Sequence, residues 1–184
     1  MNDDGDHLGG VTGVLKSIGY AIRQVQPTRV IVVFDGKGGS QSRKKRFSGY
    51  KADRDPNKLR VNRQYAGMMN IEDERESMKR QFVWLNEMLN YLPVTNMIYD
   101  GVEADDVIGT YATQASAAKR ATVISTGDKD MAQLVSDHVT LVNTMTETTM
   151  DRQGVIDKFG VTPEQIIDYL ALMGDTADNI PGVP

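Results

Sequence analysis

The stretch Val30-Ile31-Val32-Val33-Phe34, followed directly by Asp35, decides the fold of this chain. An uninterrupted apolar run with four β-branched residues is typical of a strand that is buried on both faces in a parallel sheet. Pro27 ends the segment before it, and a glycine-rich turn at residues 36–39 follows it. The stretch therefore predicts a buried parallel strand that ends at a carboxylate.

Apolar residues recur with helical or strand-like spacing along the rest of the chain. Thr162 is a good N-cap for a helix at 163–173, because Pro163 then takes its first position. The other predicted helices are 8–25, 72–92, 104–116, 129–135 and 153–159, and the predicted strands are 30–34, 96–99, 121–125, 139–143 and, beside the last, 147–150. This alternation predicts a three-layer α/β domain, in which helices cover both faces of a central, mostly parallel sheet. The buried side of the helix at 72–92 is expected to carry Phe82, Leu85, Met88, Leu89 and Leu92.

The composition fits one folded domain and excludes several classes of protein. The chain has 184 residues, of which 40% are hydrophobic, so it can bury a core. It has no cysteine, which excludes disulfides and thiolate metal sites. No apolar run is long enough to span a bilayer, and the acidic stretch after Met1 does not resemble a signal peptide. We therefore expect a cytoplasmic location.

Charge is distributed unevenly along the sequence. Residues 43–63 contain nine basic and two acidic side chains, a net charge of +7, which leaves −11 for the rest of a chain whose total is −4. The polar composition of residues 41–70 predicts an exposed, mobile segment. Its aromatic residues, Phe47, Tyr50 and Tyr65, are candidates to stack on unpaired bases. A basic strip beside an acidic body indicates contact with nucleic acid phosphates, and the alternative is an ordinary solvated surface.

Acidic residues follow three of the predicted strands at the points where those strands end. Ligands bind beyond the carboxyl ends of parallel strands, so we expect these acids to share one edge of the sheet. Spacings of two in a turn and three at a helix start let neighbouring acids face the same way. Taken singly they are ordinary caps, but their convergence indicates a site. The strands lead to Asp35, to Glu103, Asp105 and Asp106, and to Asp128 and Asp130, while Asp175 and Asp178 follow the last helix.

Clustered carboxylates raise the pKa of one another, and a bound divalent cation removes that cost. The candidate ligands are all oxygens, and neither His7 nor His138 lies in a cluster. The sequence therefore favours Mg²⁺ or Mn²⁺ over Zn²⁺. Two such ions, about 3.5–4 Å apart, can hold and cleave a phosphodiester.

Five stretches match, in order, the motifs of one nuclease family. They are Val32-Val33-Phe34-Asp35-Gly36-Lys37-Gly38, Tyr50-Lys51-Ala52-Asp53-Arg54, Gly101-Val102-Glu103-Ala104-Asp105-Asp106-Val107-Ile108-Gly109, Ile124-Ser125-Thr126-Gly127-Asp128-Lys129-Asp130-Met131-Ala132-Gln133-Leu134, and the segment from Asp168 to Pro184. The chain resembles the 5′ nuclease or flap endonuclease family, which includes the 5′-3′ exonuclease domain of bacterial DNA polymerase I and phage 5′-3′ exonucleases. The resemblance implies a PIN-like α/β fold. It also implies a 5′-3′ exonuclease or flap endonuclease that cuts DNA with a free 5′ end, in replication or repair, in a bacterial or phage-infected cell.

The resemblance also implies roles for individual residues. Lys51 and Arg54 are implied to be catalytic, and with Tyr50 they lie at the base of a helical arch, at about 41–80, that grips the 5′ strand. Arg43, Lys44 and Arg46 are further expected DNA contacts in the same segment. The first metal site is implied to consist of Asp35, Glu103, Asp105 and Asp106, and the second of Asp128, Asp130, Asp175 and Asp178.

The two ends of the chain depart from the family pattern. Family members begin with an apolar strand that ends in a metal-binding aspartate, and they continue into a helix-hairpin-helix that binds the duplex. Because both features are missing from residues 1–184, we expect a partial 5′ nuclease domain with weak or no activity by itself. Two alternatives stay open: a fragment that binds DNA ends without cutting, and a Toprim-type nuclease, against which the pair Asp175 and Asp178 argues.

Overall fold

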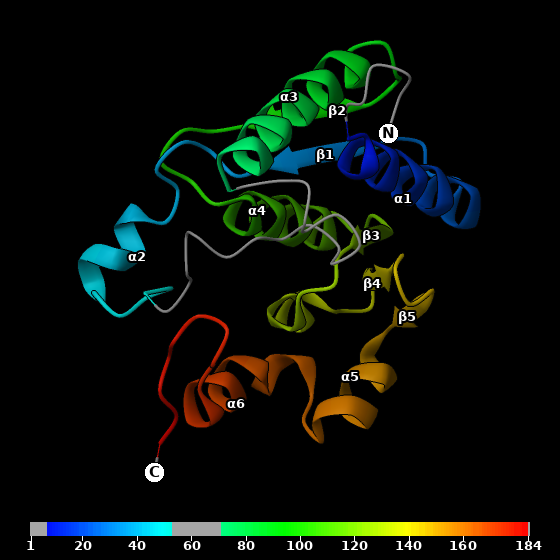
Figure 1. Ribbon diagram of the computed structural model, residues 1–184. Coiled ribbons are helices and arrows are strands. Elements are labelled where there is room, and N and C mark those ends of the chain that lie inside the picture. The colour runs from blue at the N-terminus through cyan, green and yellow to red at the C-terminus, as the bar shows by residue number, and fades with distance from the viewer. Residues whose placement is uncertain (1–6, 53–70, 184) are drawn as a thin grey trace.

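The structure is a computed structural model that describes residues 7–52 and 71–183 (Figure 1). Arg54, Tyr65 and the middle of the predicted arch at 41–80 lie outside these residues. None of the described helices is both long and apolar enough to cross a membrane.

The first half of the described chain packs two helices against one parallel pair of strands. The strands pair in register, with Ile31 opposite Thr95 and Phe34 opposite Ile98. Val11, Leu85 and Leu89 form the centre of the core between the two helices and these strands. The elements are α1 (Gly9–Val25), β1 (Ile31–Phe34), α2 (Gln41–Arg46), α3 (Ile71–Leu89) and β2 (Thr95–Ile98).

The second half has a core of its own. β3 and β4 are parallel, and β5 turns back antiparallel to β4. The centre of this core includes Ala132, Val155 and Ile166, each of which is fully buried. The elements are α4 (Ala104–Ala117), β3 (Thr122–Ser125), η1 (Lys129–Leu134), β4 (Val139–Asn143), β5 (Thr148–Met150), α5 (Arg152–Phe159), η2 (Pro163–Gln165) and α6 (Ile166–Met173).

The α/β architecture is confirmed, and so is the parallel pairing of β1 with β2 and of β3 with β4. The described strands hydrogen-bond in two groups, β1–β2 and β3–β4–β5, and not in one continuous sheet. α4 contacts both β1 and β3 and so joins the two groups. The last predicted helix begins as expected at Pro163, where the Gln165 side chain accepts a hydrogen bond from the Thr162 backbone at 3.0 Å. Its first turn is a 3₁₀ helix.

The buried side of α3 was predicted only in part. Leu85 and Leu89 are buried, but Phe82, Met88 and Leu92 remain exposed. α3 packs mainly against α1, so its covered side is a narrow stripe that continues through Glu74 and Ser77. Phe82 lies at the edge of this stripe, where its ring meets Phe34 edge-on at 5.2 Å between centroids.

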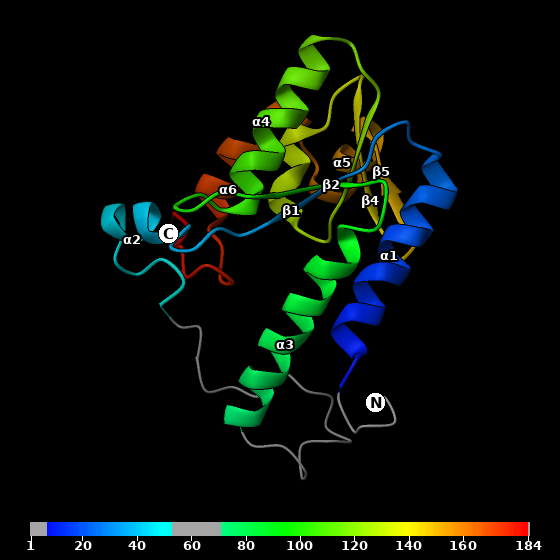
Figure 2. The same cartoon turned by 90° about the horizontal axis from the view of Figure 1, so that it is seen from above.

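The segment after β1 also differs from expectation. Residues 41–46 are polar and exposed as expected, yet they form the short helix α2. Tyr50, which follows α2, is buried. The views agree that this segment lies beside the loop after α6 (Figure 2), and the backbone N–H of Lys51 donates to the carbonyl of Asp178 at 2.9 Å.

Candidate active site

Two interlocked loops place the first group of acids. Gly36 donates its N–H to the carbonyl of Val102 at 3.0 Å, and Gly101 donates to the carbonyl of Lys37 at 2.9 Å. A side chain at position 36 is impossible without a shift, because its Cβ would lie 1.7 Å from the Tyr99 carbonyl oxygen. The ends of β1 and β2 are therefore held together, and Asp35 accepts a hydrogen bond from the Ala104 N–H at 2.8 Å.

The turn after β3 places the second pair. Asp128 caps η1 by accepting a hydrogen bond from the Asp130 N–H at 2.9 Å. The next residues, Met131 and Ala132, are buried and anchor η1 in the core. Asp130 Oδ1 is buried and has no hydrogen-bond partner.

The loop after α6 presents the third pair. Asp175 and Ile180 exchange backbone hydrogen bonds of 2.8 and 2.7 Å, which close the loop on itself. The Asp175 carboxylate accepts from the Ala177 N–H at 2.9 Å and pairs with the Lys129 ammonium at 3.2 Å. Gly174 has a φ of +72° and abuts the Gly182 backbone, so this loop is tightly packed where it leaves α6.

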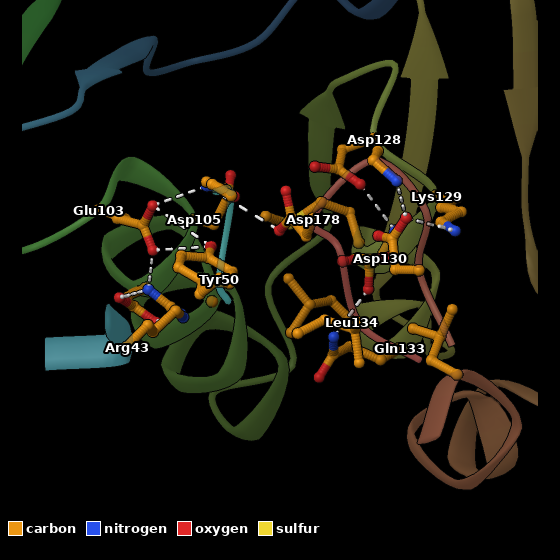
Figure 3. Close-up of a pocket in the computed structure, with 18 of the residues that line it drawn as sticks. Arg43, Tyr50, Glu103, Asp105, Asp128, Lys129, Asp130, Gln133, Leu134 and Asp178 are labelled. Atoms are coloured by element: carbon orange, nitrogen blue, oxygen red, sulfur yellow. Dashed lines mark hydrogen bonds and ion pairs between the residues drawn. The ribbon is translucent and has the colours of Figure 1, made fainter. Parts of the chain in front are cut away.

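These loops surround an open cleft of about 1240 Å³. Figure 3 shows Glu103 and Asp105 on one side of it, Asp128 and Asp130 on the other, and Asp178 between them. Asp35 is not among the lining residues and acts on the site as the cap of α4. Seven of the eight predicted metal ligands line the cleft: Glu103, Asp105, Asp106, Asp128, Asp130, Asp175 and Asp178.

Three groups from the basic segment converge on Glu103. The Lys51 ammonium lies 2.8 Å from one of its oxygens, the Tyr50 hydroxyl lies 3.3 Å from the other, and Arg43 pairs with it as well. Arg43 also makes a bidentate pair with Asp106, at 2.6 and 2.9 Å. Burial alone would raise the pKa of Glu103, but the hydrogen bond from Lys51 and the Arg43 charge lower it overall.

Two other acids are destabilised in their charged form. Burial, and then the charges of Asp128 and Asp35, raise the pKa of Asp105. Burial, followed by the charges of Asp128 and Asp175, raises the pKa of Asp130 to about 6. The crowding cost expected from the sequence is therefore present at these two positions.

Several of the carboxylates form ion pairs with basic side chains of the cleft. Within residues 7–52 and 71–183, no three acidic or histidine side chains already lie close enough together to hold one ion. Arg43, Lys51 and Lys129 lie among them and neutralise part of their charge. The donors nevertheless fit a hard divalent cation, because they are all oxygens and Asp130 Oδ1 is buried without a partner.

The predicted DNA contacts are placed differently from one another. Arg43, Arg46 and Lys51 line the cleft, whereas Lys44 lies on α2 outside the lining residues. Tyr50 also lines the cleft, but it is only 8% exposed and its hydroxyl hydrogen-bonds the Glu103 carboxylate. Arg54 lies outside the part of the chain that the structure describes.

Two contributing residues were missed by the sequence reasoning. Lys129, between Asp128 and Asp130, pairs with Asp175. Asn179 donates its side-chain amide to the Gly49 carbonyl at 3.0 Å, and so holds the basic segment. Both residues lie inside the motifs quoted above, so the motifs could have marked them as candidates. Their partners are distant in sequence and could not be inferred from spacing.

Comparison with protein families gives a match over most of the chain. The family described as the 5′-3′ exonuclease, N-terminal resolvase-like domain, matches residues 1–160. DNA polymerase I of Pseudomonas aeruginosa is 47% identical over 182 residues, which is 98% of this chain and 18% of that protein. A 5′-3′ exonuclease of Aquifex aeolicus is 33% identical over 94% of this chain and 54% of its own length. The chain thus spans about a fifth of such a polymerase and about half of such an exonuclease.

Solved structures show the same fold. A bacteriophage T5 protein co-crystallised with metal ions superposes with a TM-score of 0.72 at 24% identity, covering 94% of this chain and 61% of that one. A flap endonuclease of bacteriophage T5, in a pseudo-enzyme–product complex with DNA and metal ions, gives the same values. At this identity the likeness supports the fold alone, and it confirms the predicted PIN-like α/β arrangement.

Proposed function

We propose, because this chain belongs to the family of 5′-3′ exonuclease N-terminal resolvase-like domains, that it carries the cutting centre of a structure-specific 5′ nuclease. Its substrate is DNA with a free 5′ end, as at a flap or a nick, in replication or repair. One observation carries the proposal: seven carboxylates from three separate segments of the chain line one cleft together with Arg43 and Lys51. An acidic cleft that is also lined by basic side chains is suited to a metal-assisted reaction at a phosphate.

We infer that the acids of the cleft hold divalent cations, Mg²⁺ or Mn²⁺, in two groups. When bound, such ions polarise a phosphodiester and lower the pKa of an attacking water. Asp130 supports this assignment, because its buried Oδ1 lacks a partner and its charge is unfavourable without a counter-ion. The first group is Glu103, Asp105 and Asp106, with Asp35 beside them as the acceptor that holds the start of α4, and the second is Asp128, Asp130, Asp175 and Asp178.

The basic side chains hold the substrate in this proposal. The Lys51 side chain is mostly buried and stands between Glu103 and Asp178, so its ammonium is fixed at the floor of the cleft. Arg43 is more exposed and reaches the cleft from α2. We propose that Lys51 contacts the scissile phosphate, and that Arg43, Lys44, Arg46 and Arg54 contact phosphates of the 5′ strand. The role of Tyr50 is to hydrogen-bond Glu103, and not to stack on a base.

A labelled 5′-flap substrate tests the proposal. Any cleavage by this chain, which we expect to be weak, should require Mg²⁺ or Mn²⁺ and should stop in EDTA. Asp128→Asn should abolish cutting while leaving DNA binding within about twofold, because it removes a metal ligand and not a phosphate contact. Asp137→Asn is the matched control, since Asp137 is exposed and precedes β4, at the opposite end of the strand from the cleft. Cutting that survives Asp128→Asn would refute the metal assignment.

A second function is favoured by one observation. The basic side chains already neutralise several of the acids, and no ready three-ligand group exists among the described residues. A domain that grips DNA ends without cutting is therefore the alternative. A gel shift of the flap substrate in Mn²⁺ without any product would support it. The match of the exonuclease family to residues 1–160 argues against a Toprim-type nuclease.

A further inference from the structure

The turn that carries Lys51 is attached to the loop after α6 by two hydrogen bonds. The Lys51 N–H donates to the Asp178 carbonyl at 2.9 Å. The Asn179 side-chain amide donates to the Gly49 carbonyl at 3.0 Å, across 130 positions of sequence. One bond is made by Lys51 itself and the other by Gly49 two residues before it, so the loop after α6 holds this turn at two points.

Lys51 needs such support because of its backbone conformation. Its φ is +55°, in the left-handed region that lysine rarely adopts. Asn179 has a φ of +57°, which asparagine tolerates better than most residues. The strain at Lys51 therefore persists only while its neighbours hold the turn in place.

The loop that provides this support has backbone hydrogen bonds of its own. Asp175 and Ile180 close it with two backbone hydrogen bonds, and the Asn179 N–H donates weakly to the Thr176 carbonyl at 3.4 Å. The same loop presents Asp178 to the cleft. The Asn179 amide therefore connects the acids of this loop to the lysine on the opposite side.

We propose that Asn179 is a positioning residue for Lys51, an inference that rests on the proposed function. Its amide fixes Gly49, the strained turn then holds Lys51, and the ammonium lies 2.8 Å from Glu103 and 4.7 Å from the centre of the Tyr50 ring. Without the amide, the turn relaxes to an ordinary φ and the ammonium leaves the floor of the cleft.

Two substitutions separate the amide from the backbone. Asn179→Gly accepts the positive φ but has no side chain to donate. Asn179→Asp keeps the size and the turn preference, but its carboxylate cannot donate to the Gly49 carbonyl. Asn86→Ala is the matched control, because it removes another partly buried amide contact, the 2.7 Å bond from Asn96, far from the cleft.

The first measurement is the labelling of lysines by reductive methylation in EDTA, followed by mass spectrometry. Methylation of Lys51, relative to Lys158 on α5, should rise about fivefold or more in both Asn179 variants and stay unchanged in the control. The second measurement is steady-state cleavage of the 5′ flap. kcat should fall about tenfold or more, with KM changed by less than about twofold, because orientation is lost and not substrate affinity.

Unchanged Lys51 labelling in both variants would overturn the inference, and so would raised labelling with an unaltered kcat. Thermal unfolding identifies a variant that has simply lost its fold, and the other variant then carries the test. Labelling does not require cleavage, so it decides whether Asn179 holds Lys51 even if the wild-type chain leaves flap DNA intact. That last result would count against the proposed function alone.

Discussion

Asp130 should make the wild-type chain less stable as the pH rises, and Asp130→Asn should remove this pH dependence. The effect is opposite in sign to that of most aspartates. In most proteins a carboxylate has a lowered pKa in the folded state and stabilises at neutral pH. Burial and the nearby charges of Asp128 and Asp175 instead raise the pKa of Asp130 to about 6 from an ordinary 3.8. Between these values the folded state keeps a proton that the unfolded state has lost. The stability of the wild-type chain therefore falls as the pH rises through this interval.

The magnitude follows from the size of the shift. Each pKa unit corresponds to about 1.4 kcal/mol, so the shift from 3.8 to about 6 is worth at most about 3 kcal/mol. The cleft is open to water, which screens part of the repulsion and makes about 2 kcal/mol the more realistic value. Asparagine does not titrate, so the variant loses this pH dependence. An unpaired buried amide shifts its stability by a constant that cancels when two pH values are compared.

Urea unfolding in EDTA, at pH 4 and at pH 7.5, measures the effect. The free energy of unfolding of Asp130→Asn, minus that of the wild type, should be larger at pH 7.5 by about 2 kcal/mol. Asp157→Asn, on exposed α5, is the control and should show no such change. If the difference in free energy of unfolding between variant and wild type is equal at the two pH values, the pKa of Asp130 is not raised in the folded state.

Three further predictions concern the cleft, the interlocked loops and the core. Arg43→Ala removes a guanidinium that competes for two carboxylates, so calorimetry should show Mn²⁺ binding strengthened by roughly fivefold or more; unchanged affinity would contradict this. Gly36→Ala should lower the free energy of unfolding by about 3 kcal/mol because its Cβ collides with backbone, whereas Gly13→Ala in α1, with open space around it, should raise it by about 0.5–1 kcal/mol; equal urea midpoints would refute the collision. Ile166 is 0% exposed, so Ile166→Ala should lower the free energy of unfolding by about 2–5 kcal/mol. Its neighbour Ile167 is 61% exposed, so Ile167→Ala should lower it by less than about 1 kcal/mol. The reverse order would show that the core lies on the other side of α6.

The elements could be predicted from the sequence wherever local pattern determines structure. β1 and β4 are runs of β-branched and apolar residues, and their bounds agree with prediction to within one residue. The turn at Asp128 and Asp130 was also predictable, because an aspartate after a strand caps the helical turn that follows it. These features depend on neighbours in sequence.

Features that depend on partners distant in sequence could not be predicted from local pattern. Tyr50 lies in a basic, polar segment, and it is buried where it meets Glu103, a partner 53 positions away in sequence. Phe82 has the spacing of a core residue, but α3 meets too few neighbours on that side to cover it. The ion pairs of Arg43 and Lys51 arise from the meeting of two loops, which residue spacing along the chain does not specify.

The two separate hydrophobic cores have a consequence for how this domain responds to what it binds. Each core has its own strands, and α4 is the helix that packs on strands of both groups, so we expect the two halves to differ in local stability. The cleft lies on the boundary between them, with Glu103 beside the first half and Asp128 and Asp175 on the second. An ion or a phosphate bound by acids of both halves would act as a cross-link between the two halves. Binding in the cleft should therefore slow the hydrogen exchange of backbone amides in both halves, as far away as α1 and α5.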